Sequence, residues 1–286
     1  METDSTALDI AAIRNDIIEL LAANRIIIPG IPEVAQQVRQ AATDPRPSLA
    51  EIARIAEQDP ALAAHLIKLS NVVALRRGEE IRNLLNAVTR LGARLIAVAA
   101  TNFAIMQMVA QLPRHAARLR ALYQQSLEIG ERCYALALRH PHLVPEEALL
   151  TGLVHAIGVP VILQYTRLRP RLQATAALEA LLQELQAPIG AELLRRWCFP
   201  DHIATAVEVH EDLYRGTAQD LPDYGDVLIA ARLGLSRESE QSFTPNLPPS
   251  LARLSLGPAR PTSLELSSPE TSDYDIHEFC LALRAS

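Results

Sequence analysis

The 286-residue sequence contains little of what β-sheet proteins and metal- or disulfide-stabilised folds need. Aromatic residues make up 4% and glycines number 11, which argues against an all-β sandwich or barrel. The three cysteines (Cys133, Cys198 and Cys280) are odd in number and far apart, so we expect no disulfide or zinc framework and a reducing cytoplasm. Lys68 is the only lysine among 27 basic residues, and we interpret this arginine bias as composition rather than phosphate recognition.

Charge and hydropathy narrow the class of protein further. The net charge of −6 argues against nucleic-acid binding spread over the whole protein. The acidic start, Met1–Asp4, lacks the basic and apolar segments of a secretory signal, so we expect no signal peptide. Leu95–Leu112 carries no charge and approaches the length of a membrane span, but Thr101 and Asn102 interrupt it. We therefore expect a helix buried within the protein, and no membrane partner.

Helical periodicity runs along most of the chain, whereas the alternation typical of strands persists nowhere, so we predict an all-α fold. The first helix is expected between a cap near Ser5 or Thr6 and Asn24, and Ser48 and Asp59 have the positions of later N-caps. Further helices are predicted over residues 32–42, 48–58, 60–73, 81–91, 93–111, 115–139, 145–158, 160–166, 171–185, 188–197, 201–212 and 223–234.

Breaks in composition predict how the chain is divided. Leu112-Pro113 interrupts the helical pattern and is interpreted as a lobe boundary. The expected parts are an N-terminal helix (1–25), a first helical lobe (26–112), a second helical lobe (113–235), a flexible Ser/Pro-rich linker (236–272) and a candidate C-terminal docking helix (273–286).

The C-terminal segment has one apolar face. Ile276, Phe279 and Leu283 lie on the same side of a predicted helix, behind a cap at Ser272. Such a helix either docks on its own protein or fits a groove of a partner, and the sequence leaves both alternatives open. We therefore name these three residues as candidate partner contacts.

One stretch points to a known chemistry. The chain has no Gly-rich phosphate loop, no nucleophile elbow and no His-Glu-x-x-His motif. However, Leu149–Gly158, which contains His155, is similar to the helix that carries the His-Asp pair of HD-type metal phosphohydrolases. Such hydrolases need several His and Asp side chains from different helices to hold divalent metals that activate water.

The resemblance implies that this metal site is lost. Ala156 follows His155 where the metal-bridging aspartate would stand. The other ligand positions of the resemblance fall on Gln125 and Arg232, and an arginine would repel a divalent cation. We expect no catalytic residue, metal or cofactor, and we treat Gln125, His155, Ala156, His210 and Arg232 as vestigial positions. The alternative is a residual phosphohydrolase or a cyclic-nucleotide-binding protein that uses His155 and His210.

Several motifs in order carry a second, more specific resemblance. They are Ile28–Ala35, Ile55–Ala63, Leu66–Asn71, Ala87–Gly92, Ile189–Pro200 and Val207–His210. Together they resemble the HDOD family, bacterial signal-output modules related to HD hydrolases but usually without the metal site. The resemblance covers about residues 26–235, and it departs from the family at Val72 and over residues 76–80.

The HDOD resemblance implies a two-lobed all-α fold and a non-catalytic role in bacterial signal transduction. The expected partners are signalling proteins such as a sensor kinase, a receiver or a diguanylate cyclase, near two-component or cyclic di-GMP circuits. Because the resemblance takes up most of the length, we expect no such domain on this chain. We interpret Asn71 as a loop-bonding residue, Trp197 as a packing anchor, and Arg167, Arg169 and Arg171 as a solvated basic loop.

Overall fold

The structure is a computed structural model. It describes residues 9–23, 25, 33–44, 46, 48–72, 80–167, 169–217, 220–234, 248–256 and 276–285. Within these ranges every regular element is helical, as the sequence predicts. The predicted cap at Ser272 and the segment 73–79 lie outside the described residues.

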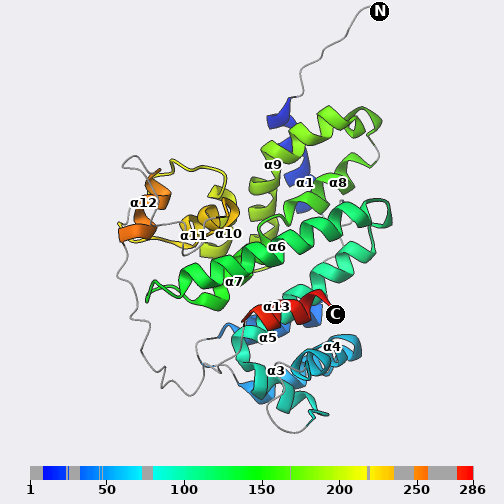
Figure 1. Cartoon of the computed structure of the whole chain (residues 1–286). Helices are drawn as coiled ribbons and strands as arrows, with labels where there is room; N and C mark the ends of the chain where they lie inside the picture. Colours follow the sequence, from blue (N-terminus) through cyan, green and yellow to red (C-terminus); the bar gives the residue numbers. More distant parts are fainter. Residues whose placement is uncertain are drawn as a thin grey trace, which may run out of the picture.

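Most of the described helices are short, and three of them are clearly longer than the rest (Figure 1). In chain order they are α1 (Ile10–Ala22), α2 (Glu33–Ala42), α3 (Leu49–Ala56), α4 (Pro60–Ser70), α5 (Leu84–Ala110), α6 (Ala116–Ala137), α7 (Pro145–Val154), α8 (Gly158–Thr166), α9 (Thr175–Arg196), α10 (Asp201–Val209), α11 (Tyr224–Arg232), α12 (Pro249–Leu256) and α13 (Ile276–Arg284). Short 3-10 turns occur at Pro113–His115 and Pro170–Gln173.

Local sequence signals explain where several helices begin. The side chains of Ser48 and Asp59 accept hydrogen bonds from the first turns of α3 and α4, as predicted. The carboxylate of Asp9 caps α1 in the same way, so this helix begins after the expected Ser5 or Thr6, which lie outside the described residues. An acidic cap closer to the apolar stripe satisfies the same free N–H groups.

Helix α5 is a buried helix with one sharp kink. Gly92 adopts φ 77° and ψ 157°, which only glycine adopts readily, and it divides α5 where the sequence predicts a break. Two segments, Leu84–Ala110 and Pro145–Thr166, are long and apolar enough to cross a membrane by length and composition. However, in the apolar 18-residue window of each segment, 61% and 94% respectively are buried within the protein, which fits core helices.

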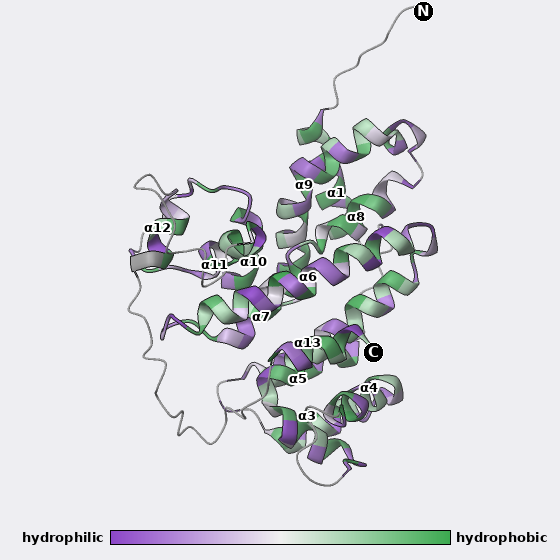
Figure 2. Cartoon of the chain, viewed as in Figure 1, coloured by the Kyte–Doolittle hydropathy of each residue, from purple (hydrophilic) through white to green (hydrophobic). Residues whose placement is uncertain are grey.

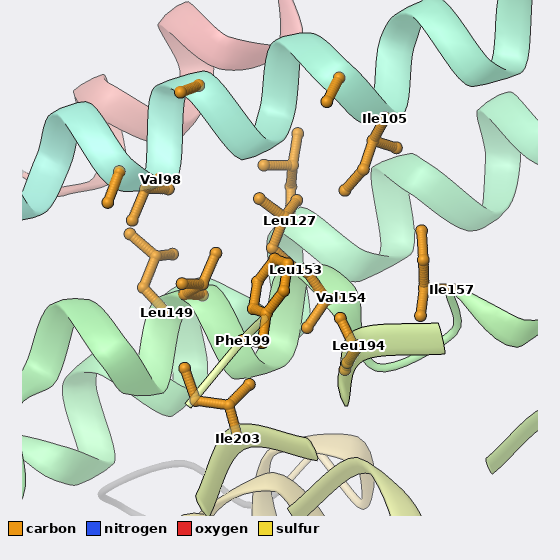
Figure 3. Close-up of a cluster of buried hydrophobic side chains, with 14 of the residues drawn as sticks. Val98, Ile105, Leu127, Leu149, Leu153, Val154, Ile157, Leu194, Phe199 and Ile203 are labelled. Carbon is orange, nitrogen blue, oxygen red and sulfur yellow. The ribbon is translucent and has the colours of Figure 1, made fainter. Parts of the chain in front are cut away.

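The helices pack in two groups around one continuous hydrophobic core. Helices α2, α3 and α4 pack on α5, and helices α6 to α11 pack mainly on one another, with α1 against α9 (Figure 1). In Figure 2, α8 is almost uniformly hydrophobic, in agreement with its burial between neighbouring helices. Figure 3 shows the junction of the two groups, where Val98 and Ile105 of α5 face Leu127, Leu153 and Phe199.

The closest helix contacts depend on glycine. A Cβ atom on Gly152 would lie 2.4 Å from the Cα atom of Gly130, so α6 and α7 pack backbone against backbone. A Cβ atom on Gly158 would lie 2.1 Å from the carbonyl oxygen of Gln186, which brings α8 equally close to α9. The glycines of the Leu149–Gly158 motif therefore position His155 by allowing α7 and α8 to lie deep in the bundle.

A buried arginine joins α2 to the loop after α9. Arg39 is 1% exposed, and its Nη2 atom donates hydrogen bonds to the carbonyl oxygens of Trp197 (2.7 Å) and Cys198 (3.0 Å). Its guanidinium also lies 3.9 Å from the ring centre of Phe199. Trp197, predicted as a packing anchor for the second lobe, is partly buried and packed against the core, and Phe199 is the residue enclosed against Arg39.

Helix α9 differs from the prediction of two helices, 171–185 and 188–197. It runs without interruption from Thr175 to Arg196 and contains Pro188 in its interior. A proline there removes one backbone hydrogen bond. The buried residues Leu181, Leu185 and Leu194 on both sides of it hold the two halves against the core, which offsets that loss.

The expected linker over residues 236–272 is also corrected, because Pro249–Leu256 form the helix α12. Arg253 of α12 donates two hydrogen bonds (2.8 and 2.6 Å) to the fully buried carboxylate of Asp226 on α11. The hydroxyl of Ser250 donates to the carbonyl oxygen of Leu213 at 2.6 Å. Residues 236–247 and 257–272 lie outside the described residues.

Helix α13 is docked on its own protein, so the structure adopts one of the two alternatives left open by the sequence. Phe279 and Leu283 are buried against helices of the body, and Ile276 is partly buried there. Figure 1 shows α13 between α5 and α6. The face predicted as a partner contact is therefore occupied by an intramolecular contact in this structure.

The structure also shows the contacts of Asn71 and of the basic loop over residues 167–171. The side chain of Asn71 bonds the loop after α4, since its amide donates to the carbonyl oxygens of Ile67 and Ile81 and its oxygen accepts from the Ile81 N–H. In the basic loop, Arg167 and Arg171 are exposed as expected. Arg169 instead donates to Asp16 at 3.2 Å and ties this loop to α1.

Candidate functional site

The site predicted from the His155 motif forms where the ends of α7 and α10 meet. His155 directly follows α7, and its Nδ1 atom donates to the carbonyl oxygen of Gly152 at 2.8 Å. His210 directly follows α10, and its Nδ1 atom donates to the carbonyl oxygen of Val207 at 2.5 Å. Because a carbonyl can only accept, both imidazoles carry the proton on Nδ1 and present a bare lone pair on Nε2.

The two imidazoles lie together in the interior. Their ring centres are 5.8 Å apart with an edge-to-face arrangement, and both residues are buried. Burial and the nearby Arg232 together lower the pKa of His155 to about 4, against the opposing effect of its hydrogen bond to Gly152. Burial, Arg232 and His155 together lower the pKa of His210 to about 3. Both side chains are therefore neutral at neutral pH.

Arg232 at the end of α11 places a positive charge beside the histidines. Its Nη1 atom donates to the carbonyl oxygen of His210 at 3.2 Å, and its Nη2 atom lies 3.8 Å from a carboxylate oxygen of Glu211. Burial lowers the pKa of Arg232, and Glu211 partly reverses this effect. The side chain is 31% exposed, so this arginine forms the solvent-facing edge of the site.

The residues present do not fit a divalent metal. The aspartate position is occupied by buried Ala156, which has no ligand atom. Glu211 is the carboxylate beside the histidines, but its oxygen accepts a 2.7 Å hydrogen bond from Gln186 and faces Arg232. Within the residues that the structure describes, no three His, Cys, Asp or Glu side chains are grouped so that they could hold a metal ion. Two imidazoles beside a guanidinium are a poor donor set for a dication.

The structure brings together four of the five positions predicted as vestigial. The fifth, Gln125, does not face the site. His155, Ala156, His210 and Arg232 meet at the ends of α7, α10 and α11, whereas Gln125 has an exposed side chain on α6. A helix presents neighbouring residues in different directions, and the neighbour Ser126 is the one that points inward.

Sequence reasoning did not identify the polar residues that complete the site. Gln186 of α9 holds Glu211, and Arg132 of α6 donates to the carbonyl oxygen of Ala231, the residue before Arg232. These contacts link segments that are 25 and 99 residues apart in the chain. No local pattern in the sequence signals them, because each pair depends on how the helices pack.

Comparisons with known proteins agree with this geometry. The family model of the HDOD domain matches residues 28–213 of the chain. The chain belongs to the HDOD domain family. Within this family, the matched residues include the motif helix α7, both histidines and the Arg39 contact described above.

Solved structures show the same HDOD fold. A protein from Shewanella amazonensis SB2B, provisionally named a metal-dependent phosphohydrolase, is 26% identical with a TM-score of 0.66, covering 96% of this chain and 98% of that one. An HDOD domain protein of unknown function from Geobacter sulfurreducens is 18% identical, with a TM-score of 0.63 and coverage of 87% and 91%. A protein from Marinobacter aquaeolei VT8, provisionally named a signal transduction protein, is 18% identical with a TM-score of 0.58, covering 98% of this chain and 65% of that one.

A curated relative is longer than this chain. An uncharacterized protein of Treponema pallidum (strain Nichols) is 23% identical over 219 residues, which is 71% of this chain but 41% of the relative. The chain thus spans less than half the length of that relative.

Proposed function

We propose that this HDOD chain is a non-catalytic module of bacterial signal transduction that acts in the cytoplasm through contacts with other proteins. The observation that carries the proposal is the set of side chains around His155 and His210. There, two neutral histidines face Arg232, and Ala156 takes the place of the bridging carboxylate. A metal-activated water needs a negatively charged cage that these side chains do not provide.

The remaining architecture supports a binding role. With two neutral histidines and an arginine where a hydrolase would hold its metal, the fold would act through its helical surface. The signal-transduction name of the Marinobacter relative supports this direction for the family fold. The proposed partner is a signalling protein such as a sensor kinase, a receiver or a diguanylate cyclase, and nucleic acid is not proposed because the net charge is −6.

Capture with the full chain tests this proposal. Affinity purification of the tagged chain from its native cells, followed by mass spectrometry, should recover a kinase, receiver or cyclase in stoichiometric amounts. In parallel, the purified chain should not hydrolyse phosphate mono- or diesters in the presence of Mn²⁺. Metal-dependent turnover that His155→Gln abolishes would refute the non-catalytic role.

Binding of a cyclic dinucleotide is the second candidate, because Arg232 offers a half-accessible guanidinium next to buried polar atoms. The hydrogen bonds of His155 and His210 argue against it, since both leave an Nε2 lone pair that would repel a phosphate oxygen. Calorimetry with cyclic di-GMP should therefore give no saturable heat. Binding that Arg232→Ala removes would instead establish a nucleotide site.

A further inference from the structure

Helix α13 bridges the two groups of helices at a surface that the proposed function does not yet use. On one side, the carboxylate of Glu131 on α6 lies 2.7 Å from His277, and that of Glu128 lies 3.6 Å from Arg284. On the other side, Nζ of Lys68 on α4 donates to the carbonyl oxygen of Ala285 at 3.5 Å. The apolar residues Phe279 and Leu283 of α13 are buried against the body, and α13 lies between α5 and α6 (Figure 1).

The interior of the groove between α4, α5 and α6 combines apolar and polar contacts. Phe279 is 0% and Cys280 1% exposed, so the centre of α13 is fully enclosed. Beneath its last turn, the hydroxyl of Tyr123 is hydrogen-bonded to Asn102 and lies 3.3 Å from the carbonyl oxygen of Leu283. The groove therefore recognises a helix both by its apolar face and by a carbonyl at its C-terminal end.

Helix α13 does not use every group that the groove provides. The buried Nδ2 atom of Asn102 on α5 has no hydrogen-bond partner among the described residues, and on α13 itself the buried Nε atom of Arg284 has none either. Unpaired buried donors weaken a contact. A helix that brings an acceptor to Asn102 and keeps the same apolar and basic positions would satisfy the groove better than α13 does.

The length of α13 makes it easy to release. It has nine residues, which is shorter than the helices that are stable alone in water, so it folds only as it docks. Residues 257–275 connect it to α12, so 19 residues separate the two helices. Because α13 belongs to the same chain as the groove, its docking is intramolecular, and a partner helix must compete with an effective concentration on the order of 1 mM.

We propose that the groove between α4, α5 and α6 is a helix-binding site that α13 occupies in the resting protein and from which a basic amphipathic helix of a partner displaces it. Glu128 and Glu131 form an acidic rim that favours a basic helix. The unpaired Nδ2 atom of Asn102 would bind a helix more tightly if that helix carried a hydrogen-bond acceptor to the floor of the groove. This inference rests on the proposed function and names the surface and the class of partner for it.

The cysteines provide a direct test of release in the full chain. In a Cys198→Ser background, which removes the exposed thiol, the labelling rates of Cys280 and Cys133 by Ellman's reagent are compared by mass spectrometry. Cys133 lies on α6 at 0% exposure and reports global unfolding, whereas Cys280 reports release of α13. We expect Cys280 to react at least about tenfold faster, as local opening does. Equal rates would show that α13 opens only when the whole protein unfolds, and would overturn the proposal.

A peptide in trans tests the groove itself. The probe is a fluorescein-labelled peptide of residues 276–285 with Cys280→Ser. It should bind full-length Phe279→Ala/Leu283→Ala at least about tenfold more tightly than the wild type, because α13 no longer competes. The matched control is Leu281→Ala, which alters the exposed face of α13 and should behave as the wild type.

Charge-reversal variants test whether the acidic rim selects a basic helix, and the oligomeric state tests whether a second copy of the chain occupies the groove. Adding Glu131→Lys to the double variant should weaken binding of the peptide, and a peptide with Arg284→Glu should bind the double variant more weakly. Equal binding in all variants, or a wild-type dimer that exchanges α13 between two copies, would overturn the proposal. These measurements use only this chain and its own peptide, so their failure is distinguishable from failure to capture a signalling partner.

Discussion

The contact of Arg39 offers the sharpest test of how the two groups of helices are held together. This arginine is buried between α2 and the loop after α9, where two carbonyl oxygens accept from it and the ring of Phe199 lies beneath it. Burial lowers the pKa of Arg39 to about 10, which leaves it charged at neutral pH. Its Nε and Nη1 atoms have no hydrogen-bond partner among the described residues.

Replacing Arg39 changes the free energy of unfolding through contributions of opposite sign. Arg39→Met removes two charge-assisted hydrogen bonds of about 1.5–3 kcal/mol each and a desolvated cation–π contact of about 2 kcal/mol. It also removes the cost of burying a charge with two unpaired donors, which is several kcal/mol. The free energy of unfolding should therefore fall by only about 1–2 kcal/mol. Arg39→Ala also leaves a cavity in place of the aliphatic stem, so its loss should reach about 4 kcal/mol.

Urea unfolding of the full chain, followed by circular dichroism, measures both variants. Substitutions of Arg54, which is exposed on α3, serve as matched controls and should change the free energy by less than about 0.5 kcal/mol. An Arg39→Ala variant as stable as the wild type would refute the role of this contact. Equal losses for Met and Ala would show that the charge, and not the packing of its stem, carries the stability.

Three further predictions concern the site and the helices that support it. The folded pKa values of His155 and His210, about 4 and about 3, lie below the unfolded value, so their contribution is complete above about pH 6.5 and is lost as the pH falls toward the folded values. Between pH 7 and 5 the pair should lose about 4 kcal/mol of unfolding free energy in urea titrations. The double glutamine variant should lose about 4 kcal/mol less than the wild type over this range, because His65 and His140, whose pKa values burial also lowers, titrate in both chains. Gly152→Ala should destabilise the chain by about 2 kcal/mol or more in thermal unfolding, because the new methyl group would meet the backbone of α6; an unchanged melting temperature would contradict this packing. Arg253→Ala should cost about 3 kcal/mol, since it leaves the buried Asp226 with one partner fewer, and hydrogen exchange should show that α12 is released; unchanged protection of α12 would rule this out.

Much of the fold could be predicted because its signals are local. Asp59 caps the turn that immediately follows it, and α5 kinks at Gly92 because glycine adopts the positive φ found there without strain. The order of motifs along the chain predicts one site for His155 and His210, and their ring centres lie 5.8 Å apart. Such features depend on a few neighbouring residues or on a pattern shared with relatives.

The features of the fold that could not be predicted depend on contacts between residues far apart in the sequence. Helix α12 lies in a Ser/Pro-rich stretch without clear periodicity, and its docking rests on the buried carboxylate of Asp226, 27 residues before Arg253. Pro188 has the local signature of a helix break, yet packing on both sides keeps α9 continuous. Arg39 meets its carbonyl partners 158 and 159 residues later in the chain. No window of sequence contains these pairs, so only the assembled structure shows them.

Titration of the purified chain with Mn²⁺ in a calorimeter tests most directly whether the site of His155 and His210 holds a divalent metal. We expect no saturable heat for the wild type. Ala156→Asp/Arg232→Asp, which returns carboxylates to both positions, serves as the reference for restored binding. Stoichiometric binding of Mn²⁺ to the wild type that is lost in His155→Gln and His210→Gln would show instead that the two histidines hold a metal.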